Sequence, residues 1–141
     1  MDDANDKNGK ERPIIGKKIV IVDDEVEQID FASTVLEENG YIPIRAMDGK
    51  EGMRKVKTEK PDLILLDILM PERSGIGMYQ DLKHDEETKN IPVIIVTAVP
   101  RGGRFDGVMM TQQKTLPAPD GYVEKPMNPD ALLKLVSDLL S

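Results

Sequence analysis

At residues 62–67 the chain reads Asp-Leu-Ile-Leu-Leu-Asp, an apolar run bounded by two aspartates. The run is too uniformly apolar for a strand with one face in water, so it predicts a central parallel strand covered on both faces. Residues 91–97 and 121–125 predict further strands of the same sheet. Helix-like segments alternate with the strands, which favours single crossovers and helices on both faces of the sheet.

The amino-terminal part of the chain repeats this alternation. Residues 17–22 are a β-branched run that predicts a strand. Residues 26–39 predict a helix that ends at Gly40, and residues 41–45 predict an edge strand because of Pro43. The helix rests on apolar residues at helical spacing, namely Val26, Ile29, Phe31, Ala32, Val35 and Leu36. Further helices are predicted at 48–58, 75–83, 105–114 and from Pro129 onward, after a capping Asn128. The predicted fold class is α/β, a doubly wound five-stranded parallel sheet flanked by helices.

The length, charge and residue composition of the chain exclude several classes of function. The chain has 141 residues, enough for one domain, and we expect a flexible polar leader at 1–14 and the domain at 15–141. A net charge of −7 argues against non-specific nucleic-acid binding. No apolar run approaches the roughly 20 residues of a membrane span, and the amino terminus has no secretory pattern. The absence of cysteine excludes thiolate chemistry and is compatible with the cytoplasm, where we expect the protein.

Polar residues stand at the carboxyl ends of four predicted apolar strands: Asp23-Asp24, Asp67, Thr97 and Lys125. A single aspartate at a strand end usually caps the following helix. Four such signals, in parallel strands whose carboxyl ends meet at one edge, predict a ligand site at that edge.

The residue types at this edge suit phosphoryl transfer. Three carboxylates from Asp23, Asp24 and Asp67 would raise one another's pKa unless a cation is present. Oxygen ligands without His or Cys favour a hard cation, and Mg²⁺ is the expected one. The Lys125 ammonium and the Thr97 hydroxyl would stabilise a phosphoryl group arriving on Asp67, which can act as the nucleophile.

The sequence resembles the receiver domain of bacterial response regulators across residues 17–140. The matching stretches are residues 20–25, residues 67–75 with the pattern D-x-x-M-P-x-x-x-G, residues 96–98 and residues 124–126. The resemblance implies a flavodoxin-like receiver topology. It also implies a phosphorelay signalling role rather than an enzyme with turnover.

The resemblance assigns roles to the metal and phosphoryl ligands. Asp67 would be the phosphoacceptor, and Asp24 would bind Mg²⁺ directly with Asp23 acting mainly through water. The backbone carbonyl of Leu69 would be another ligand. Lys125 would contact the phosphoryl group, followed by a cis peptide bond to Pro126.

Two residues would form the switch: Thr97 would move toward the phosphoryl group, and Tyr122 would change rotamer on phosphorylation. The apolar residues Leu69 and Val99 would slow attack by water on the acyl phosphate. His84 lies in a charged stretch and is read as a solvated helix end. Residues 100–120 are rich in Gly and Pro, depart from the family pattern and are predicted to be mobile or restructured.

The expected partners are a histidine kinase or phosphotransfer protein and a downstream protein target. The protein is expected to be a monomer or weak homodimer, without an attached output domain and without contact to nucleic acid or membrane. Alternatives are a receiver-like interaction module with a vestigial site and a receiver excised from a hybrid kinase. A flavodoxin-like electron carrier is disfavoured by Asp-Asp-Glu after the first strand, and a Mg²⁺-dependent phosphohydrolase by Leu69 where its second aspartate is needed.

Overall fold

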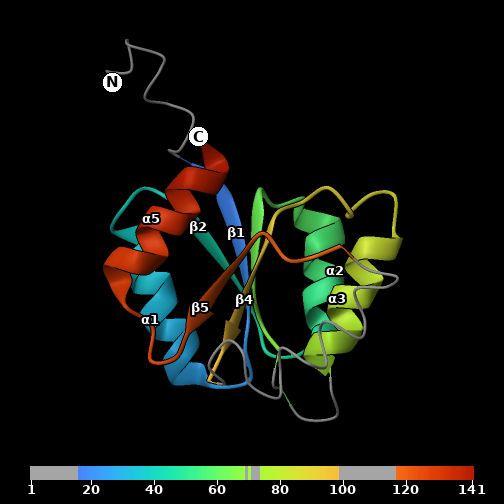
Figure 1. Cartoon of the computed structure of the whole chain (residues 1–141), viewed down its shortest axis with the longest axis horizontal. Coiled ribbons are helices and arrows are strands. Elements are labelled where there is room, and N and C mark those ends of the chain that lie inside the picture. The colour runs from blue at the N-terminus through green and yellow to red at the C-terminus, as the bar shows by residue number, and fades with distance from the viewer. Residues whose placement is uncertain (1–15, 69, 71–73, 99–116) are drawn as a thin grey trace.

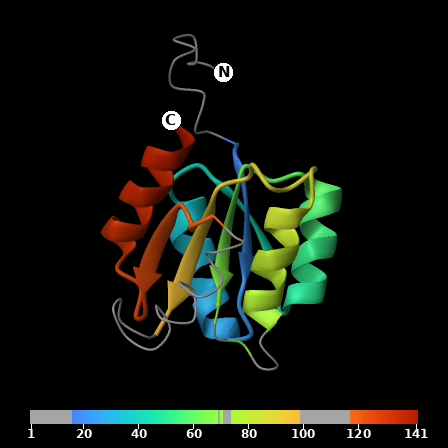
Figure 2. The same ribbon diagram turned by 45° about the vertical axis from the view of Figure 1, so that its right-hand side comes forward.

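The chain folds around one parallel sheet of five strands in the order β2-β1-β3-β4-β5. The computed structural model describes residues 16–68, 70, 74–98 and 117–141. The strands all point toward the same edge of the sheet (Figures 1 and 2). Their bounds are β1 Lys18–Val22, β2 Ile42–Ala46, β3 Leu63–Asp67, β4 Val93–Thr97 and β5 Gly121–Glu124.

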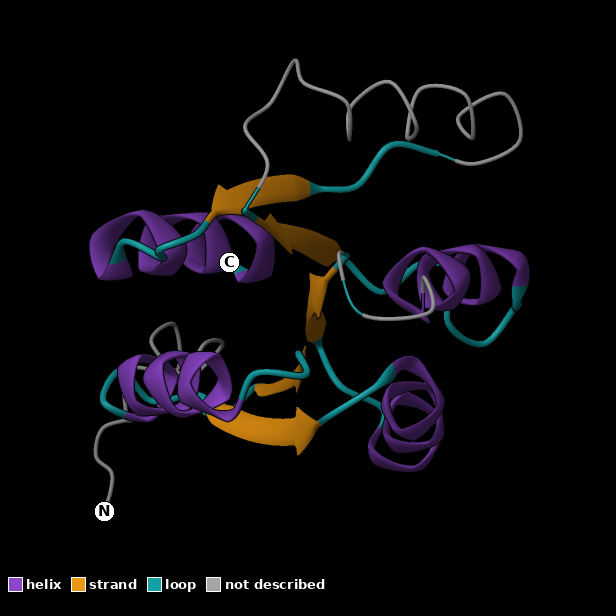
Figure 3. Ribbon diagram, turned by 90° about the horizontal axis from the view of Figure 1, so that it is seen from below, coloured by secondary structure: helices purple, strands orange, loops and turns teal. Residues whose placement is uncertain are grey.

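Helices cover both faces of the sheet, as predicted. Helices α1 and α5 lie on one face, and α2 and α3 lie on the other (Figure 3). The bounds of these helices are α1 Val26–Glu37, α2 Gly49–Glu59, α3 Ser74–His84 and α5 Pro129–Leu140. The expected doubly wound α/β architecture is therefore confirmed.

Alternate residues of the central strands supply two separate cores. In β3, Ile64 and Leu66 pack toward α2 and α3, whereas Leu63 and Leu65 pack toward α1 and α5. Every residue of β3 and of β4 is buried. A strand whose two faces are both covered has no position for a polar side chain along its length. Polar residues are consequently confined to the strand ends, where the sheet meets solvent.

Strand β2 begins one residue later than the sequence predicts. Gly40 has a φ of 91°, and the Tyr41 N–H donates to the Leu36 carbonyl at 3.1 Å. Tyr41 thus closes the turn after α1, and its ring is buried in the core beneath α1 and α5. The prediction that Pro43 lies in an edge strand is confirmed.

Fewer apolar residues of α1 are buried than the sequence analysis predicts. Ile29, Ala32 and Leu36 are buried, but Val26 is 54% and Phe31 38% exposed. Ser33 is buried in place of an apolar residue, and its hydroxyl accepts a hydrogen bond from Arg45 of β2 at 3.5 Å. The buried face of α1 therefore includes a polar contact with the edge strand β2, which the spacing of apolar residues does not predict.

Some helix ends carry the residues that capping preferences predict, and others do not. The Asn128 side chain accepts from the Ala131 N–H at 2.9 Å and caps α5 as predicted. Helix α2 ends on Lys60 in the left-handed conformation, where glycine is the usual residue. Within the described residues, every helix is too short or too polar to cross a membrane.

Several predictions lie outside the described residues: the leader at 1–14, the helix at 105–114, Leu69, Val99 and most of the 100–120 segment.

Candidate functional site

The carboxyl edge of the sheet brings together the residues that the sequence places at strand ends. Asp23 directly follows β1, Asp67 and Thr97 end β3 and β4, and Lys125 follows β5. Asp67 is in register with Val96, and Thr97 with Glu124, so the three strand ends lie level with one another. The expected convergence on one edge is therefore present.

Lys125 is at the centre of this group. Its ammonium nitrogen lies 3.1 Å from Asp23 Oδ2, 2.9 Å from Glu25 Oε1 and 3.3 Å from Asp67 Oδ2. The main chain fixes the residue as well, because the Lys125 N–H donates to the Thr97 carbonyl at 2.9 Å. The peptide bond from Lys125 to Pro126 is cis, as the family resemblance implies.

The electrostatic environment keeps Lys125 charged. Burial alone would lower the pKa of the ammonium. The hydrogen bonds to Glu25 and Asp23, together with the charges of Asp67 and Asp23, reverse that effect and raise the pKa above its ordinary value. Asp23 is 3% and Asp67 4% exposed, so both carboxylates depend on this cation for compensation.

The carboxylates of Asp23, Asp24 and Asp67 form a compact oxygen cluster. One oxygen from each lies within 4.8 Å of the others, with Asp24 exposed and the other two buried. With Glu25 the edge gathers four carboxylates, three of which contact the Lys125 ammonium, and this leaves a local excess of negative charge. This donor set fits a hard divalent cation such as Mg²⁺, which takes carboxylate and water oxygens.

Glu25 is a site residue to which the sequence analysis assigned no role. It occupies the N-cap position of α1 but makes no capping hydrogen bond with its side chain. Its backbone N–H donates to Asp23 Oδ1 at 2.9 Å, and its carboxylate pairs with Lys125. Ser, Thr, Asp and Asn are preferred at an N-cap position. The presence of glutamate there was the sequence signal that this side chain has another partner.

Helix α3 approaches the end of β3 unusually closely at Gly75. A Cβ atom at this position would lie 2.4 Å from the Asp67 carbonyl oxygen and 2.7 Å from Ile68 Cα. Only glycine permits this approach. The glycine of the D-x-x-M-P-x-x-x-G pattern therefore fixes α3 against the backbone of Asp67.

Of the remaining predicted residues, Thr97 and Tyr122 belong to strands that end at this edge, whereas His84 lies at the other end of the domain. Thr97 is 1% exposed. Tyr122 is half-buried and packs against the core beneath α2 and α3. Met70 and Met78 are core residues of the same cluster, and His84 is exposed at the end of α3, as expected. Leu69, the expected carbonyl ligand, lies outside the described residues.

Residues 117–120 lead into β5 and are tied to the rest of the domain. The Tyr79 hydroxyl donates to the Pro117 carbonyl at 2.7 Å, and the Val93 N–H donates to Asp120 Oδ2 at 2.8 Å. These contacts fix the end of the 100–120 segment that the structure describes.

Comparison with known proteins agrees with this geometry. Residues 19–137 match the family model described as the response regulator receiver domain. The alkaline phosphatase synthesis transcriptional regulatory protein PhoP of Bacillus subtilis is 36% identical over 82% of this chain and 45% of its own length. Protein PilH of Pseudomonas aeruginosa is 34% identical over 88% of this chain and 98% of its own. The structure of the chemotaxis response regulator CheY4 of Vibrio cholerae matches with a TM-score of 0.75 and 26% identity, covering 89% of this chain and 99% of that one.

The chain belongs to the response regulator receiver domain family of two-component systems. It spans about half the length of PhoP and of the PhoB regulators to which it is similar. Receiver domains are generally phosphorylated on an aspartate, bind Mg²⁺ at an acidic pocket and have a signalling role.

Proposed function

We propose that Asp67 is the residue of this receiver domain that accepts the phosphoryl group, from a histidine kinase or a phosphotransfer protein. The observation that carries the proposal is the Lys125 ammonium, 3.3 Å from Asp67 Oδ2 at the edge where Asp23 and Asp24 also converge. An Asp67 oxygen attacks the phosphorus, the bond between phosphorus and the donor nitrogen breaks, and an acyl phosphate forms on the carboxylate.

The neighbouring residues supply charge and hydrogen bonds to the incoming group. Lys125 exchanges its contact with the Asp67 carboxylate for a phosphoryl oxygen, and the Thr97 hydroxyl donates to another. Asp23, Asp24, Asp67 and the Leu69 carbonyl are the proposed ligands for Mg²⁺. When bound, the ion would neutralise part of the carboxylate and phosphoryl charge.

The phosphorylated domain is proposed to signal by protein–protein contact rather than by turnover. Leu69 stands two residues after Asp67, where a phosphohydrolase of this chemistry needs an acidic group, so hydrolysis should be slow. The apolar side chains of Leu69 and Val99 are proposed to limit access of water. Thr97 and Tyr122 are the proposed switch pair, and the cytoplasm is the proposed compartment.

The test is phosphorylation by acetyl phosphate with Mg²⁺, followed by intact-protein mass spectrometry. The wild type should gain one phosphoryl group and Asp67→Asn should gain none. Asp62→Asn is a matched control, because Asp62 lies at the other end of β3, and it should be phosphorylated like the wild type. Equal mass gain in Asp67→Asn and the wild type would refute the assignment, as would no gain in the wild type.

The metal requirement is tested in the same assay. Chelation of Mg²⁺ should abolish the mass gain, and Asp24→Asn should raise the Mg²⁺ concentration needed for half-maximal phosphorylation. Phosphorylation that is independent of Mg²⁺ would argue against the proposed ion site.

A further inference from the structure

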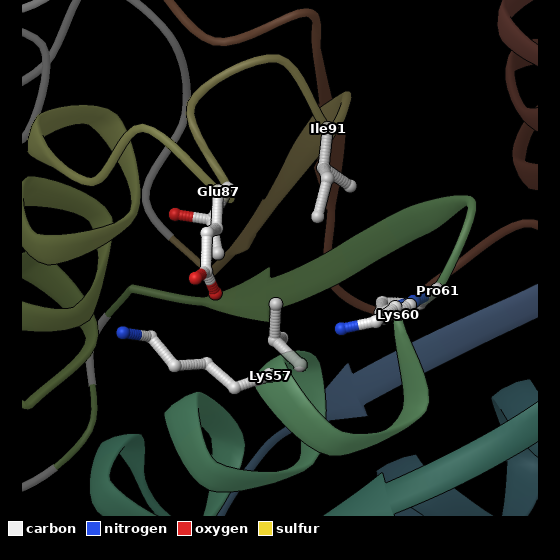
Figure 4. Close-up of a pocket in the computed structure, with 7 residues that line it drawn as sticks. Lys57, Lys60, Pro61, Glu87 and Ile91 are labelled. Atoms are coloured by element: carbon white, nitrogen blue, oxygen red, sulfur yellow. The ribbon is translucent and has the colours of Figure 1, made fainter.

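A cleft of about 360 Å³ opens at the amino-terminal edge of the sheet, the edge opposite to Asp67 (Figure 4). It lies between the end of α2 and the segment that joins α3 to β4. Its volume is at the lower end of the range for small-molecule sites, roughly 300–1,000 Å³. The residues that line it are Val56, Lys57, Lys60, Pro61, Glu87, Thr88 and Ile91.

The wall formed by residues 85–91 is held rigidly by its own hydrogen bonds. The Thr88 hydroxyl donates to the Leu82 carbonyl at 2.7 Å, and the Glu87 N–H donates to Asp85 Oδ1 at 2.8 Å. The Ile91 N–H donates to the Thr88 carbonyl at 3.0 Å. The cleft is therefore formed before any ligand arrives, which removes the ordering cost of binding.

Lys60 forms the other wall in a conformation that lysine rarely adopts. It has a φ of 50°, and its N–H donates to the Val56 carbonyl at the end of α2. Glycine is the residue that fits this position without steric cost. The left-handed backbone itself ends α2, but a lysine there costs more than glycine would, and residues held at such a cost concentrate at functional sites.

The cleft presents opposite charges that do not neutralise each other directly. The ammonium of Lys60 and the carboxylate of Glu87 reach into the cleft from opposite walls (Figure 4). Among the described residues, neither group has an ion-pair partner within 4 Å, although the Glu87 charge, after that of Asp85, helps to raise the pKa of the nearby Lys57 ammonium. The other lysine, Lys57, is already engaged by Asp85 at 2.6 Å. Between the two unpaired charges the floor is apolar, because Val56 and Pro61 are buried beneath it and Ile91 is half-buried.

We propose that this cleft binds a small zwitterion with an apolar side chain, such as an aliphatic amino acid. The ligand carboxylate pairs with Lys60 and the ligand ammonium pairs with Glu87. The apolar part of the ligand packs against Ile91, over the buried Val56 and Pro61. A ligand with one charge would pair with either Lys60 or Glu87 and leave the other to solvent, so the opposed charges favour a ligand that carries both.

The test uses L-leucine as the probe, with amide chemical shifts of the full chain as the readout. Leucine should shift the amides of residues 56–60 and 87–91 in a saturable manner. Isovalerate, which lacks the ammonium, and isopentylamine, which lacks the carboxylate, should each bind about fivefold more weakly, the order expected for one partly exposed ion pair. No saturable shift near the solubility limit of leucine, or equal binding of all three probes, would overturn the proposal.

Variants at Lys60 separate ligand binding from folding. Lys60→Gly should weaken saturable leucine binding about fivefold, the order for one lost ion pair, while leaving Tm unchanged or higher, because glycine relieves the left-handed backbone. Lys60→Arg should keep the binding, and Glu87→Gln should weaken it about fivefold. Lys89→Ala is the matched control, because Lys89 is an exposed lysine of the same segment paired with Glu86, and it should bind as the wild type does. Undiminished binding by Lys60→Gly would refute the site.

This site does not depend on the phosphorylation chemistry. Asp67→Asn should bind leucine as the wild type does, even though it should not accept a phosphoryl group. Loss of leucine binding in Asp67→Asn would contradict the assignment to the amino-terminal edge.

Discussion

The two ends of β3 carry the same residue type in opposite surroundings. At the amino end, Asp62 Oδ2 accepts the Lys18 N–H at 2.8 Å, and the Asp62 N–H donates to the Lys18 carbonyl at 2.8 Å. At the carboxyl end, the Asp67 carboxylate faces the side chain of Lys125 at 3.3 Å. A carboxylate bound to a backbone N–H is committed to the fold. A carboxylate bound to a flexible ammonium can exchange that partner for a reacting group.

Asp120, just before β5, makes the same pair of backbone hydrogen bonds as Asp62 does before β3. Its carboxylate accepts the Val93 N–H at 2.8 Å, and its own N–H donates to the Val93 carbonyl at 2.9 Å. In both places an aspartate just before one strand pairs with the first residue of the adjacent strand. The amino edge therefore uses its aspartates to fix strand register, and the carboxyl edge gathers them around Lys125.

The largest effect is expected from Lys125→Met, which removes the cation shared by the carboxyl edge. Phosphorylation by acetyl phosphate should slow about 100-fold or more, the order found when one preorganised charge donor is lost. Without Mg²⁺ the free energy of unfolding in urea should fall by about 3 kcal/mol, because Asp23 and Asp67 lose their compensation. Added Mg²⁺ should restore part of that loss.

Lys134→Met is the control for this variant, because the Lys134 side chain on α5 is 79% exposed. It should match the wild type in both measurements. Phosphorylation of Lys125→Met at the wild-type rate would remove Lys125 from the proposed mechanism.

Next in size is Gly75→Ala, which pushes α3 away from the backbone of Asp67. The added Cβ would meet backbone atoms that cannot easily move, so the free energy of unfolding should fall by about 2 kcal/mol. Gly77→Ala in the same helix is the control, because a Cβ there meets nothing within 4 Å. Denaturant titration should find Gly77→Ala stabilised by about 0.5–1 kcal/mol. Equal effects of the two substitutions would mean that α3 does not press on β3 at Gly75.

Substitutions of the aspartates at the amino edge should lower stability without changing the rate of phosphorylation. Asp62→Ala and Asp120→Ala each leave a backbone N–H of the adjacent strand without its acceptor, so each should cost about 1.5 kcal/mol in urea unfolding. Neither should change the rate of phosphorylation. A rate change in either variant, with stability unaffected, would reverse the roles assigned to the two edges.

A smaller effect is expected at Tyr79, whose hydroxyl donates to Pro117. Tyr79→Phe should lower the free energy of unfolding by about 1 kcal/mol. Tyr41→Phe is the control: among the described residues, the Tyr41 hydroxyl has no hydrogen bond, and this substitution should cost less.

The Tyr79 hydroxyl also makes a prediction about pH. Burial, with the charges of Asp120 and Tyr122, raises the pKa of this hydroxyl above its ordinary value of 10.0. Its contribution to stability is therefore complete below about pH 10 and lost above it, where the unfolded chain ionises first. The raised pKa of Lys125 acts in the same direction, so the difference between wild type and Tyr79→Phe isolates the tyrosine. That difference should shrink as the pH rises above 10.

The sequence was informative where a physical constraint leaves little choice. A strand buried on both faces can carry polar groups only at its ends, and parallel strands bring their carboxyl ends together. Asp23, Asp67, Thr97 and Lys125 were predictable for that reason, and so was the order of layers. The cis bond at Lys125–Pro126 came from the family resemblance rather than from any pattern.

The features that escaped prediction depend on contacts between distant residues or on backbone conformation. Glu25 and Lys125 are 100 positions apart, and their pairing depends on side-chain placement that spacing does not encode. The exposure of Phe31 was missed because the residue was grouped with the apolar face, although it lies two positions after Ile29 and therefore about 200° round the helix. Lys60 was missed because propensity assigns its left-handed position to glycine.

We propose that the phosphoryl group is carried by Asp67 and not by another carboxylate of the cluster. Reducing the phosphorylated protein with borohydride converts an acyl phosphate to an alcohol, and peptide mass spectrometry then locates the change. We predict homoserine at position 67, with Asp23 and Asp24 unmodified. Homoserine at position 23 or 24, or no reduced residue in a protein that has gained a phosphoryl group, would contradict the claim.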